Sequence, residues 1–312
     1  MNELLQSLIR GAGLGGMYAT IAVGFVIIFR ATGVLNFAQP VFMIFGTLFS
    51  YYLVDSAGLP FPLAAVAAVA GVAAVATATE RIAMRPMVGR PAFSATLVTV
   101  GLFAAGTVLV HKLFGAKVIT SGDPWGLSNF CLGGHRPADS VVAACVGGVT
   151  VNHTDIFKVL TAVAVITALV LWLARSRYGL AMRAAAMDQE TAMAQGIDVG
   201  RVFSLSWALA GALAAVGGIL LGTAPGGVEA AAVLIALKAL PAIIIGGLDS
   251  ITGALAGAML VGLAEALTKT YQPDVAPWLG ANFDVVMPYV LLFAVLLIRP
   301  HGLFGAKEVQ RV

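Results

Sequence analysis

The residues best placed to act on another molecule lie in one polar stretch, residues 174–201, ARSRYGLAMRAAAMDQETAMAQGIDVGR. It carries four arginines and three acidic residues, spaced as in a short helix, and long apolar segments flank it on both sides. Loops at the surface of a rigid scaffold often carry binding function. We therefore interpret residues 175–201 as a docking element for a soluble partner.

Two further charged residues lie inside apolar segments. Lys238 is near the middle of the segment 231–246, so at 1.5 Å per residue it is about 12 Å from either end. A lysine at a bilayer centre costs about 3 kcal/mol on insertion scales, which favours a buried partner or a wet cavity. Two interpretations stay open: Lys238 lines a translocation path, or it donates to backbone carbonyls and pins two helices together.

Glu265 lies near the end of another apolar segment, and Lys269 follows it four residues later. Side chains at this spacing share one helix face. The sequence favours a solvated contact between these two residues over a proton relay.

The chain has no recognisable catalytic or metal-binding pattern. The four histidines are not spaced as metal ligands; they are His111, His135, His153 and His301. No glycine-rich segment follows the G-x-x-x-x-G-K-[ST] pattern that holds nucleotide phosphates. We predict no catalytic residue, no metal and no cofactor. Any nucleotide chemistry is then expected in a partner chain.

The composition is that of an integral membrane protein. Hydrophobic residues make up 60% of the chain and charged residues 11%, the mean hydropathy is +0.96, and ordinary soluble domains have about 25% charged residues. The apolar runs are about 16 to 23 residues long, close to the roughly 20 residues of a spanning helix. We expect an all-α bundle of about 8 to 9 transmembrane helices, forming one domain over residues 1–312.

The first apolar run lacks a secretory cleavage pattern, so we expect it to be retained as a helix. The expected spans lie near 13–29, 39–54, 61–79, 94–111, 155–174, 202–224, 231–246, 252–268 and 285–299.

Basic residues between the spans separate into two groups, and short loops rich in Lys and Arg stay in the cytoplasm. The larger group marks the inner side: Arg30, Arg81, Arg85, Arg90, Arg175, Arg177, Arg183, Arg201, Arg299, Lys307 and Arg311. The smaller group lies mostly around the longest loop: Arg10, Lys112, Lys117, Arg136, Lys158 and Lys269. This predicts a cytoplasmic C-terminus, a cytoplasmic 175–201 loop and an outer 112–154 loop.

Cysteine and glycine add two structural expectations. The outer loop holds Cys131 and Cys145, which form either a disulfide or two ordinary small thiols. Small residues mark close helix contacts in membranes. For Gly253-x-x-x-Gly257 we favour packing within the subunit over a dimer interface.

Several separated motifs resemble, in order, the permease subunits of bacterial ABC importers for branched-chain amino acids, a family that includes urea and short-amide relatives. The motifs are GLGGMYATIAVGFVIIFRATGVLNFAQPVFMIFG, ERIAMRPMVGRP, RYGLAMRAAAMDQETAMAQGIDVGRVFSLSWALAGALAAVGGILLG, LKALPAIIIGGLDSITGALAGAMLVGLAEAL and RPHGLFG. The resemblance extends along nearly the whole chain.

This resemblance implies a multi-pass permease in the bacterial inner membrane, without enzyme activity of its own. Its implied partners are a second homologous permease subunit, two cytoplasmic ATPase subunits, a periplasmic substrate-binding protein and membrane lipid, with no nucleic acid.

Importer permeases share a loop with Glu-Ala-Ala, three variable residues and glycine. Glu190, Ala192 and Gly196 keep this spacing, with Thr191 at the first alanine. The resemblance implies an ATPase-coupling loop of two short helical turns broken by Gly196, with Arg183, Asp188 and Glu190 for polar contacts.

The chain departs from the family near the first span. Arg30 stands where relatives usually have glycine, and Gln39-Pro40 replaces a usual His-Gly. Asn36 and Gln39 lie at this turn, which we expect to face the cytoplasm or the inner end of the path. We assign them, with Lys238, to the translocation path. The altered turn leaves small amides, urea and carboxylates open as substrates.

Two other functions remain open from the residues. The main alternative is an ion-coupled secondary transporter or a facilitative channel for a small polar solute, using Lys238 and Glu265. A membrane scaffold without transport is a third, but it does not explain the glycine-rich helices or the lysine in mid-segment.

Overall fold

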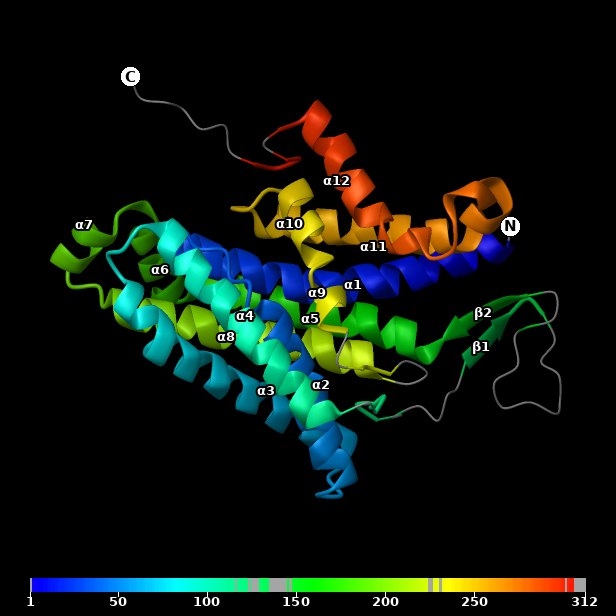
Figure 1. Cartoon of the computed structure of the whole chain (residues 1–312), viewed down its shortest axis with the longest axis horizontal. Coiled ribbons are helices and arrows are strands. Elements are labelled where there is room, and N and C mark those ends of the chain that lie inside the picture. Colours follow the sequence, from blue (N-terminus) through cyan, green and yellow to red (C-terminus); the bar gives the residue numbers. More distant parts are fainter. Residues whose placement is uncertain are drawn as a thin grey trace.

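The computed structural model is an elongated bundle of helices with a small β-hairpin at one end (Figure 1). It describes residues 2–115, 117–122, 124, 129–134, 145, 148–223, 227–229, 232–300 and 302–305.

Six helices in the described residues are long and apolar enough to span a membrane. They are α1 (Asn2–Thr32), α3 (Phe61–Thr79, prolonged to residue 87 by a π turn and a 3-10 turn), α4 (Ala92–Phe114), α5 (His153–Arg175), α8 (Val199–Gly222) and α11 (Ile251–Val275). Two shorter helices accompany them, α2 (Gln39–Asp55) and α12 (Met287–Ile298). The protein is therefore a multi-pass, all-α membrane protein.

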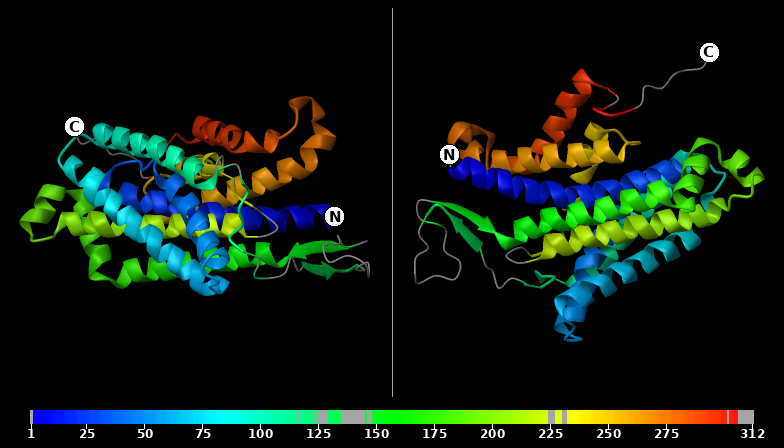
Figure 2. Two further views of the ribbon diagram at one scale, coloured as in Figure 1. Left: turned by 60° about the horizontal axis from the view of Figure 1, so that its bottom comes forward. Right: turned by 180° about the vertical axis from the view of Figure 1, so that it is seen from behind.

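Helices α1 and α8 form the centre of the bundle. Within their most apolar windows, 83% of the residues of α1 and 67% of those of α8 are buried, against 17% to 22% for α3, α4 and α5. Helix α1 packs against α5, α8 and α11, and the views in Figure 2 show these four running side by side. The outer helices expose apolar side chains, as expected where lipid replaces water.

Glycines bring the backbones of α1, α10 (Ala239–Gly246) and α11 into direct contact. A Cβ at Gly262 would collide with the backbone of Gly15, and one at Gly257 would collide with the carbonyl oxygen of Ala242. The expectation that Gly253 and Gly257 pack within the subunit is confirmed, since Gly253 lies against Gly246 in the same way.

The expected continuous span 231–246 is wrong. It is broken into α9 (Val233–Ala236) and α10 (Ala239–Gly246). Pro241 has no backbone N–H, and its ring clashes with the carbonyl four residues earlier, that of Leu237. A helix can restart with a proline in its first turn but cannot run through it, so the break falls at Leu237 and Lys238.

The span expected at 285–299 also differs from the structure. A short 3-10 turn, Pro277–Leu279, follows α11, a second one covers Phe283–Val285, and α12 is only 12 residues long.

One end of the bundle carries a two-stranded antiparallel sheet. Strand β1 (Asn129–Leu132) pairs with β2 (Val149–Asn152), and Cys131 lies opposite Thr150. Cys131 and Cys145 form a disulfide, with Cα atoms 5.5 Å apart. This decides the alternative that the sequence left open. Arg136 and His135 lie outside the described residues.

The opposite end carries α6 (Arg177–Met187) and α7 (Gln189–Ala194) (Figure 1). The basic residues expected on the inner side gather here: Arg30 lines a cavity with Arg183, and Arg90 lines another with Gln189. Lys307, Arg311 and His301 lie outside the described residues.

We predict that Gly257→Ala destabilises the protein by about 1–3 kcal/mol, because the added methyl overpacks the contact between α10 and α11. The measurement is the midpoint of thermal unfolding of the detergent-purified protein, with size-exclusion chromatography of heated samples reporting the fraction still folded. Gly101→Ala in α4 is the matched control, since nothing lies within 4 Å of a Cβ there. It should be neutral or stabilising, because alanine favours helix over glycine by about 1 kcal/mol. Equal midpoints for the two variants would contradict the packing argument.

Candidate functional site

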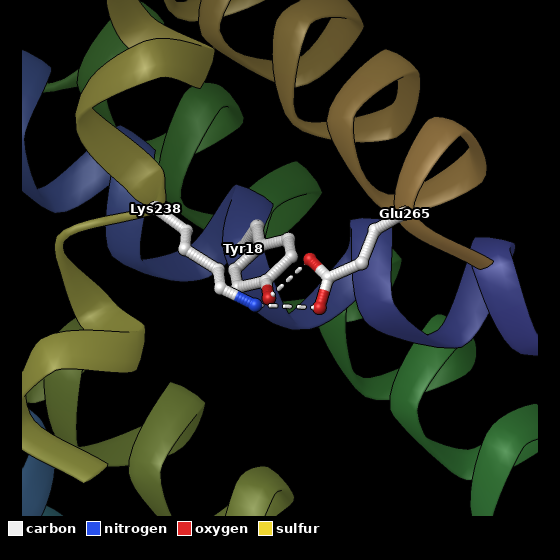
Figure 3. Close-up of polar contacts among 3 residues, drawn as sticks. All are labelled: Tyr18, Lys238 and Glu265. Carbon is white, nitrogen blue, oxygen red and sulfur yellow. Dashed lines mark hydrogen bonds and ion pairs between the residues drawn. The ribbon is translucent and has the colours of Figure 1, made fainter. Parts of the chain in front are cut away.

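A buried ion pair joins the break between α9 and α10 to helix α11. The Nζ of Lys238 donates to Oε1 of Glu265 at 2.7 Å, and the two side chains are 8% and 9% exposed. Figure 3 shows the two side chains extended toward each other from their separate elements.

Tyr18 of α1 completes this group. Its hydroxyl donates to the other carboxylate oxygen of Glu265, Oε2, at 2.8 Å, so both oxygens have a donor (Figure 3). The sequence reasoning missed Tyr18. A usable signal existed, because the hydroxyl of a tyrosine buried in an apolar helix usually finds a hydrogen-bond partner.

The predicted contact between Glu265 and Lys269 is wrong. Glu265 is 7% exposed and pairs with Lys238, 27 residues earlier. A buried carboxylate needs a charged or hydrogen-bonding partner that is buried with it. Because the helix is broken at Lys238, the ammonium group of this lysine can reach the carboxylate of Glu265. The interpretation that Lys238 donates to carbonyls fails for the same reason. Removing one member of a buried pair leaves the other charge uncompensated, so the pair holds the α9–α10 break against α1 and α11.

A second interruption lies between α1 and α2. The Nε2 of Gln39 donates to the carbonyl of Ala210 in α8 at 2.9 Å, and the Nδ2 of Asn36 donates to Oε1 of Gln39 at 3.3 Å. Asn36 also accepts from the N–H of Ala38 at 3.0 Å. Asn36 and Gln39 are both 0% exposed. The structure buries these two side chains within the bundle. That the turn faces the cytoplasm or the inner end of the path stays a prediction.

Thr99 of α4 supports the same turn. Its hydroxyl accepts from the N–H of Phe37 at 3.1 Å and donates to the carbonyl of Leu35 at 3.0 Å. Non-helical backbone at membrane depth is tolerated only where protein or a water-filled cavity satisfies it. Here the hydroxyl of Thr99 from α4 and the side chain of Asn36 from the turn itself satisfy its backbone groups, and Gln39 ties the turn to the backbone of α8.

The polar stretch at the other end folds into two capped helices, which we call the α6–α7 hairpin (residues 177–196). Ser176 caps α6 by accepting from the N–H of Gly179 at 3.0 Å. Asp188 caps α7 by accepting from the N–H groups of Glu190 at 2.9 Å and Thr191 at 3.1 Å. N-cap side chains satisfy backbone donors that the helix itself leaves free.

Hydrogen bonds from Thr191, first from its hydroxyl and then from its N–H, lower the pKa of Asp188. The ionised cap is therefore kept at neutral pH and is lost only as the pH falls through that lowered pKa.

We expected the break in the hairpin at Gly196, but it lies at Asp188, between α6 and α7. Gly196 instead ends α7, with a φ of +83° that favours glycine. Ala192 is 4% exposed and anchors α7, whereas Arg183 and Glu190 are exposed.

The hairpin also exposes two methionines. Met187 is 89% exposed and Met193 is 51% exposed. Exposed methionines next to charged side chains are suited to a protein contact, because methionine adapts its shape to a partner surface.

Among the described residues, no group of three or more His, Cys, Asp or Glu side chains could hold a metal ion.

The chain matches a protein family described as the permease component of branched-chain amino acid transport systems, over residues 7–297. It is 30% identical to the high-affinity branched-chain amino acid transport system permease protein BraD of Pseudomonas aeruginosa, over 99% of this chain and 98% of that protein. It is 29% identical to the corresponding permease protein LivH of Escherichia coli strain K12, over 99% and 97%. A solved structure, PsaBC from Streptococcus pneumoniae in complex with Fab, aligns with a TM-score of 0.49 at 15% identity, over 96% of this chain and 93% of that one.

We predict that Lys238→Met destabilises the protein by about 3–5 kcal/mol, because it leaves the Glu265 carboxylate buried without its ion-pair partner. The double variant Lys238→Met, Glu265→Leu should recover most of this loss, since it removes both charges. Tyr18→Phe should cost less, about 1.5–3 kcal/mol for one hydrogen bond to a charged group. Thermal unfolding in detergent ranks the variants, and a double variant no more stable than Lys238→Met would refute the pairing.

Proposed function

The chain belongs to the family of permease components of branched-chain amino acid transport systems, and on this premise we propose that it is the membrane subunit of an ATP-driven importer. Its cargo is a branched-chain or similar hydrophobic amino acid. The observation that carries the proposal is the family match over residues 7–297, together with a multi-pass bundle that presents a capped polar hairpin at one end.

The proposed partners follow from what the chain lacks in sequence. Because it has no nucleotide-binding motif, two ATPase subunits supply the energy. A second homologous permease subunit completes the pathway, and a periplasmic binding protein delivers the cargo. The chain forms a single permease domain over residues 1–312 in the bacterial inner membrane, with its C-terminus in the cytoplasm.

We assign the α6–α7 hairpin to contact with the ATPase. Arg183, Asp188 and Glu190 offer polar groups on its surface, and Met187 offers an adaptable apolar one. Ala192 is buried against the bundle, so a push on the hairpin is transmitted to the helices below. The cap at Asp188 and the end of α7 at Gly196 keep the two helices rigid.

The proposed path residues act at the two helix interruptions. Lys238 holds the α9–α10 break, and Asn36 and Gln39 hold the α1–α2 turn. Discontinuous helices in transporters place free backbone groups beside a substrate path. In this proposal the three side chains hold the backbone of the two interruptions in place, and this backbone lines the path.

The alternative function is an ion-coupled transporter or facilitative channel for a small polar solute, and the buried pair of Lys238 and Glu265 favours it, since ionisable residues inside membranes often mark proton or ion pathways. The energy source separates the two functions: uptake by the alternative follows a proton or sodium gradient and ignores ATP.

We predict that proteoliposomes holding the complete transporter take up radiolabelled leucine only with ATP, and that Gly196→Val abolishes this uptake. Valine is strained at a φ of +83°, which distorts the end of the hairpin. Gly58→Val is the matched control, with a φ of +63° in a turn away from the hairpin, and it should keep its uptake.

Two results would refute this function. One is leucine uptake driven by an ion gradient without ATP, or by the permease without its ATPase. The other is unchanged uptake and unchanged coupling to ATP hydrolysis in Gly196→Val.

We predict that a cysteine at the exposed position Gln195 is not labelled by a membrane-impermeant maleimide in intact spheroplasts, and is labelled in inside-out vesicles. The proposed cytoplasmic position of the hairpin is the reason. Cys131 and Cys145 are bridged and give no background without reductant. Labelling of Gln195→Cys in intact spheroplasts would place the hairpin outside and exclude it as the ATPase contact.

A further inference from the structure

A small cavity of about 190 Å³ lies next to the α6–α7 hairpin. Its walls come from the α1–α2 turn, the end of α3 and the start of α4, and from α7 and α8. Its lining residues include one acid, Glu80, and one base, Arg90.

Glu80 is the unusual member of this wall. It is 1% exposed, and its Oε2 accepts a hydrogen bond from the hydroxyl of Ser204, but no donor among the described residues reaches Oε1. A buried acceptor without a donor is costly, and native proteins have few of them. Oε1 therefore lacks a partner beside the cavity that Glu80 lines. It has almost no accessible surface in this conformation, so a ligand group reaches it when the cavity wall shifts.

The local backbone is also unusual. Glu80 begins a π-helical turn, Glu80–Met84, at the end of α3. Such turns are rare and often occur at functional sites. The turn and the free oxygen are independent observations that mark the same residue.

The rest of the cavity limits the ligand. Met84, Phe203 and Trp207 give an apolar wall, and Arg90 adds an exposed guanidinium. The volume is below the roughly 300–1,000 Å³ of pockets for drug-sized ligands. A fitting molecule is small and carries a cationic donor, an anionic group and a short apolar part.

We propose that this cavity is a binding site for one free amino acid with a small hydrophobic side chain. A shift of the cavity wall exposes Oε1 of Glu80, which then accepts from the α-ammonium group. The α-carboxylate binds to Arg90, and the side chain packs against Met84, Phe203 and Trp207. The choice of amino acid rests on the proposed function, whereas the site itself rests on the cavity and the free carboxylate oxygen.

The site is linked to the hairpin. Gln189, the first residue of α7, lines the same cavity, so a movement of the hairpin changes the cavity's shape. Two events that alter one another's equilibrium are coupled reciprocally. A bound amino acid then favours the hairpin position in which the binding cavity keeps its shape. In the proposed function, this is the end of the bundle where the cargo leaves.

The test measures binding of tritiated L-leucine to the purified transporter complex, without binding protein or nucleotide, by scintillation proximity. Glu80→Gln keeps the size of the side chain and an acceptor for Ser204. It should weaken leucine binding at least about tenfold, through loss of a charge-assisted hydrogen bond. Glu3→Gln, an exposed acid in the first turn of α1, is the matched control and should leave binding unchanged.

Two competing ligands separate the ends of the site. 4-Methylpentanoate lacks the ammonium group, so Glu80→Gln should not weaken its binding, and 3-methylbutylamine lacks the carboxylate, so Arg90→Gln should not weaken its binding. Arg90→Gln should still weaken leucine binding. Because Arg90 is exposed, this second variant keeps the test decisive if Glu80→Gln does not fold.

The proposal is overturned if the native complex binds no leucine, or if both variants bind leucine as tightly as the native complex. ATP-driven uptake by the same preparation distinguishes the two levels of argument. ATP-driven uptake without leucine binding at this cavity refutes only the binding site, whereas absence of ATP-driven uptake refutes the proposed function.

Discussion

The structure depends on one constraint, that every polar group inside an apolar bundle needs a partner. In hydrocarbon, an unpaired charge or backbone group costs several kcal/mol. The ammonium of Lys238 meets this constraint through Glu265, and the carboxylate of Glu265 is completed by Tyr18. Three elements distant in sequence are thereby held at one point. Since either charge alone would be buried without a partner, at a large cost in stability, helices α1, α10 and α11 must pack so that all three side chains meet.

The same constraint explains the α1–α2 turn. Backbone without helical hydrogen bonds enters the bundle there, and the side chains of Asn36 and Thr99 supply the missing partners, while Gln39 links Asn36 to the backbone of α8. Two interruptions are thus held by side chains and not by continuous helix. Discontinuous helices can move as separate pieces, whereas the glycine-lined contacts of α1 with α11 leave little freedom. The bundle therefore combines a rigid centre with segments whose positions depend on a few polar contacts. One of these segments, the α1–α2 turn, adjoins the hairpin.

Much of the architecture was predictable, and the errors share one cause. Apolar length and basic-residue placement identified a multi-pass bundle with a polar hairpin at one end, since these signals are local. The contact of Glu265 with Lys269 was wrong because helix spacing considers only one helix, and the true partner, Lys238, comes from a break that brings it across. The span 231–246 was expected to be continuous although Pro241 carried the signal for a break. The hairpin break was placed at Gly196 because family spacing outweighed the capping ability of Asp188.

By itself, the amino-acid sequence determined the membrane class, the approximate extent of most helices, the polar hairpin and the family, because each depends on composition, hydrophobic length or motif order along the chain. Only the tertiary structure decided that Cys131 and Cys145 are bridged and that Lys238, Glu265 and Tyr18 meet. It also decided that one oxygen of Glu80, beside a cavity, has no donor in the part of the chain that the structure describes. These are properties of distances between segments far apart in sequence. The physical reason is that satisfaction of a buried polar group depends on what packs across from it, and no local pattern records that neighbour.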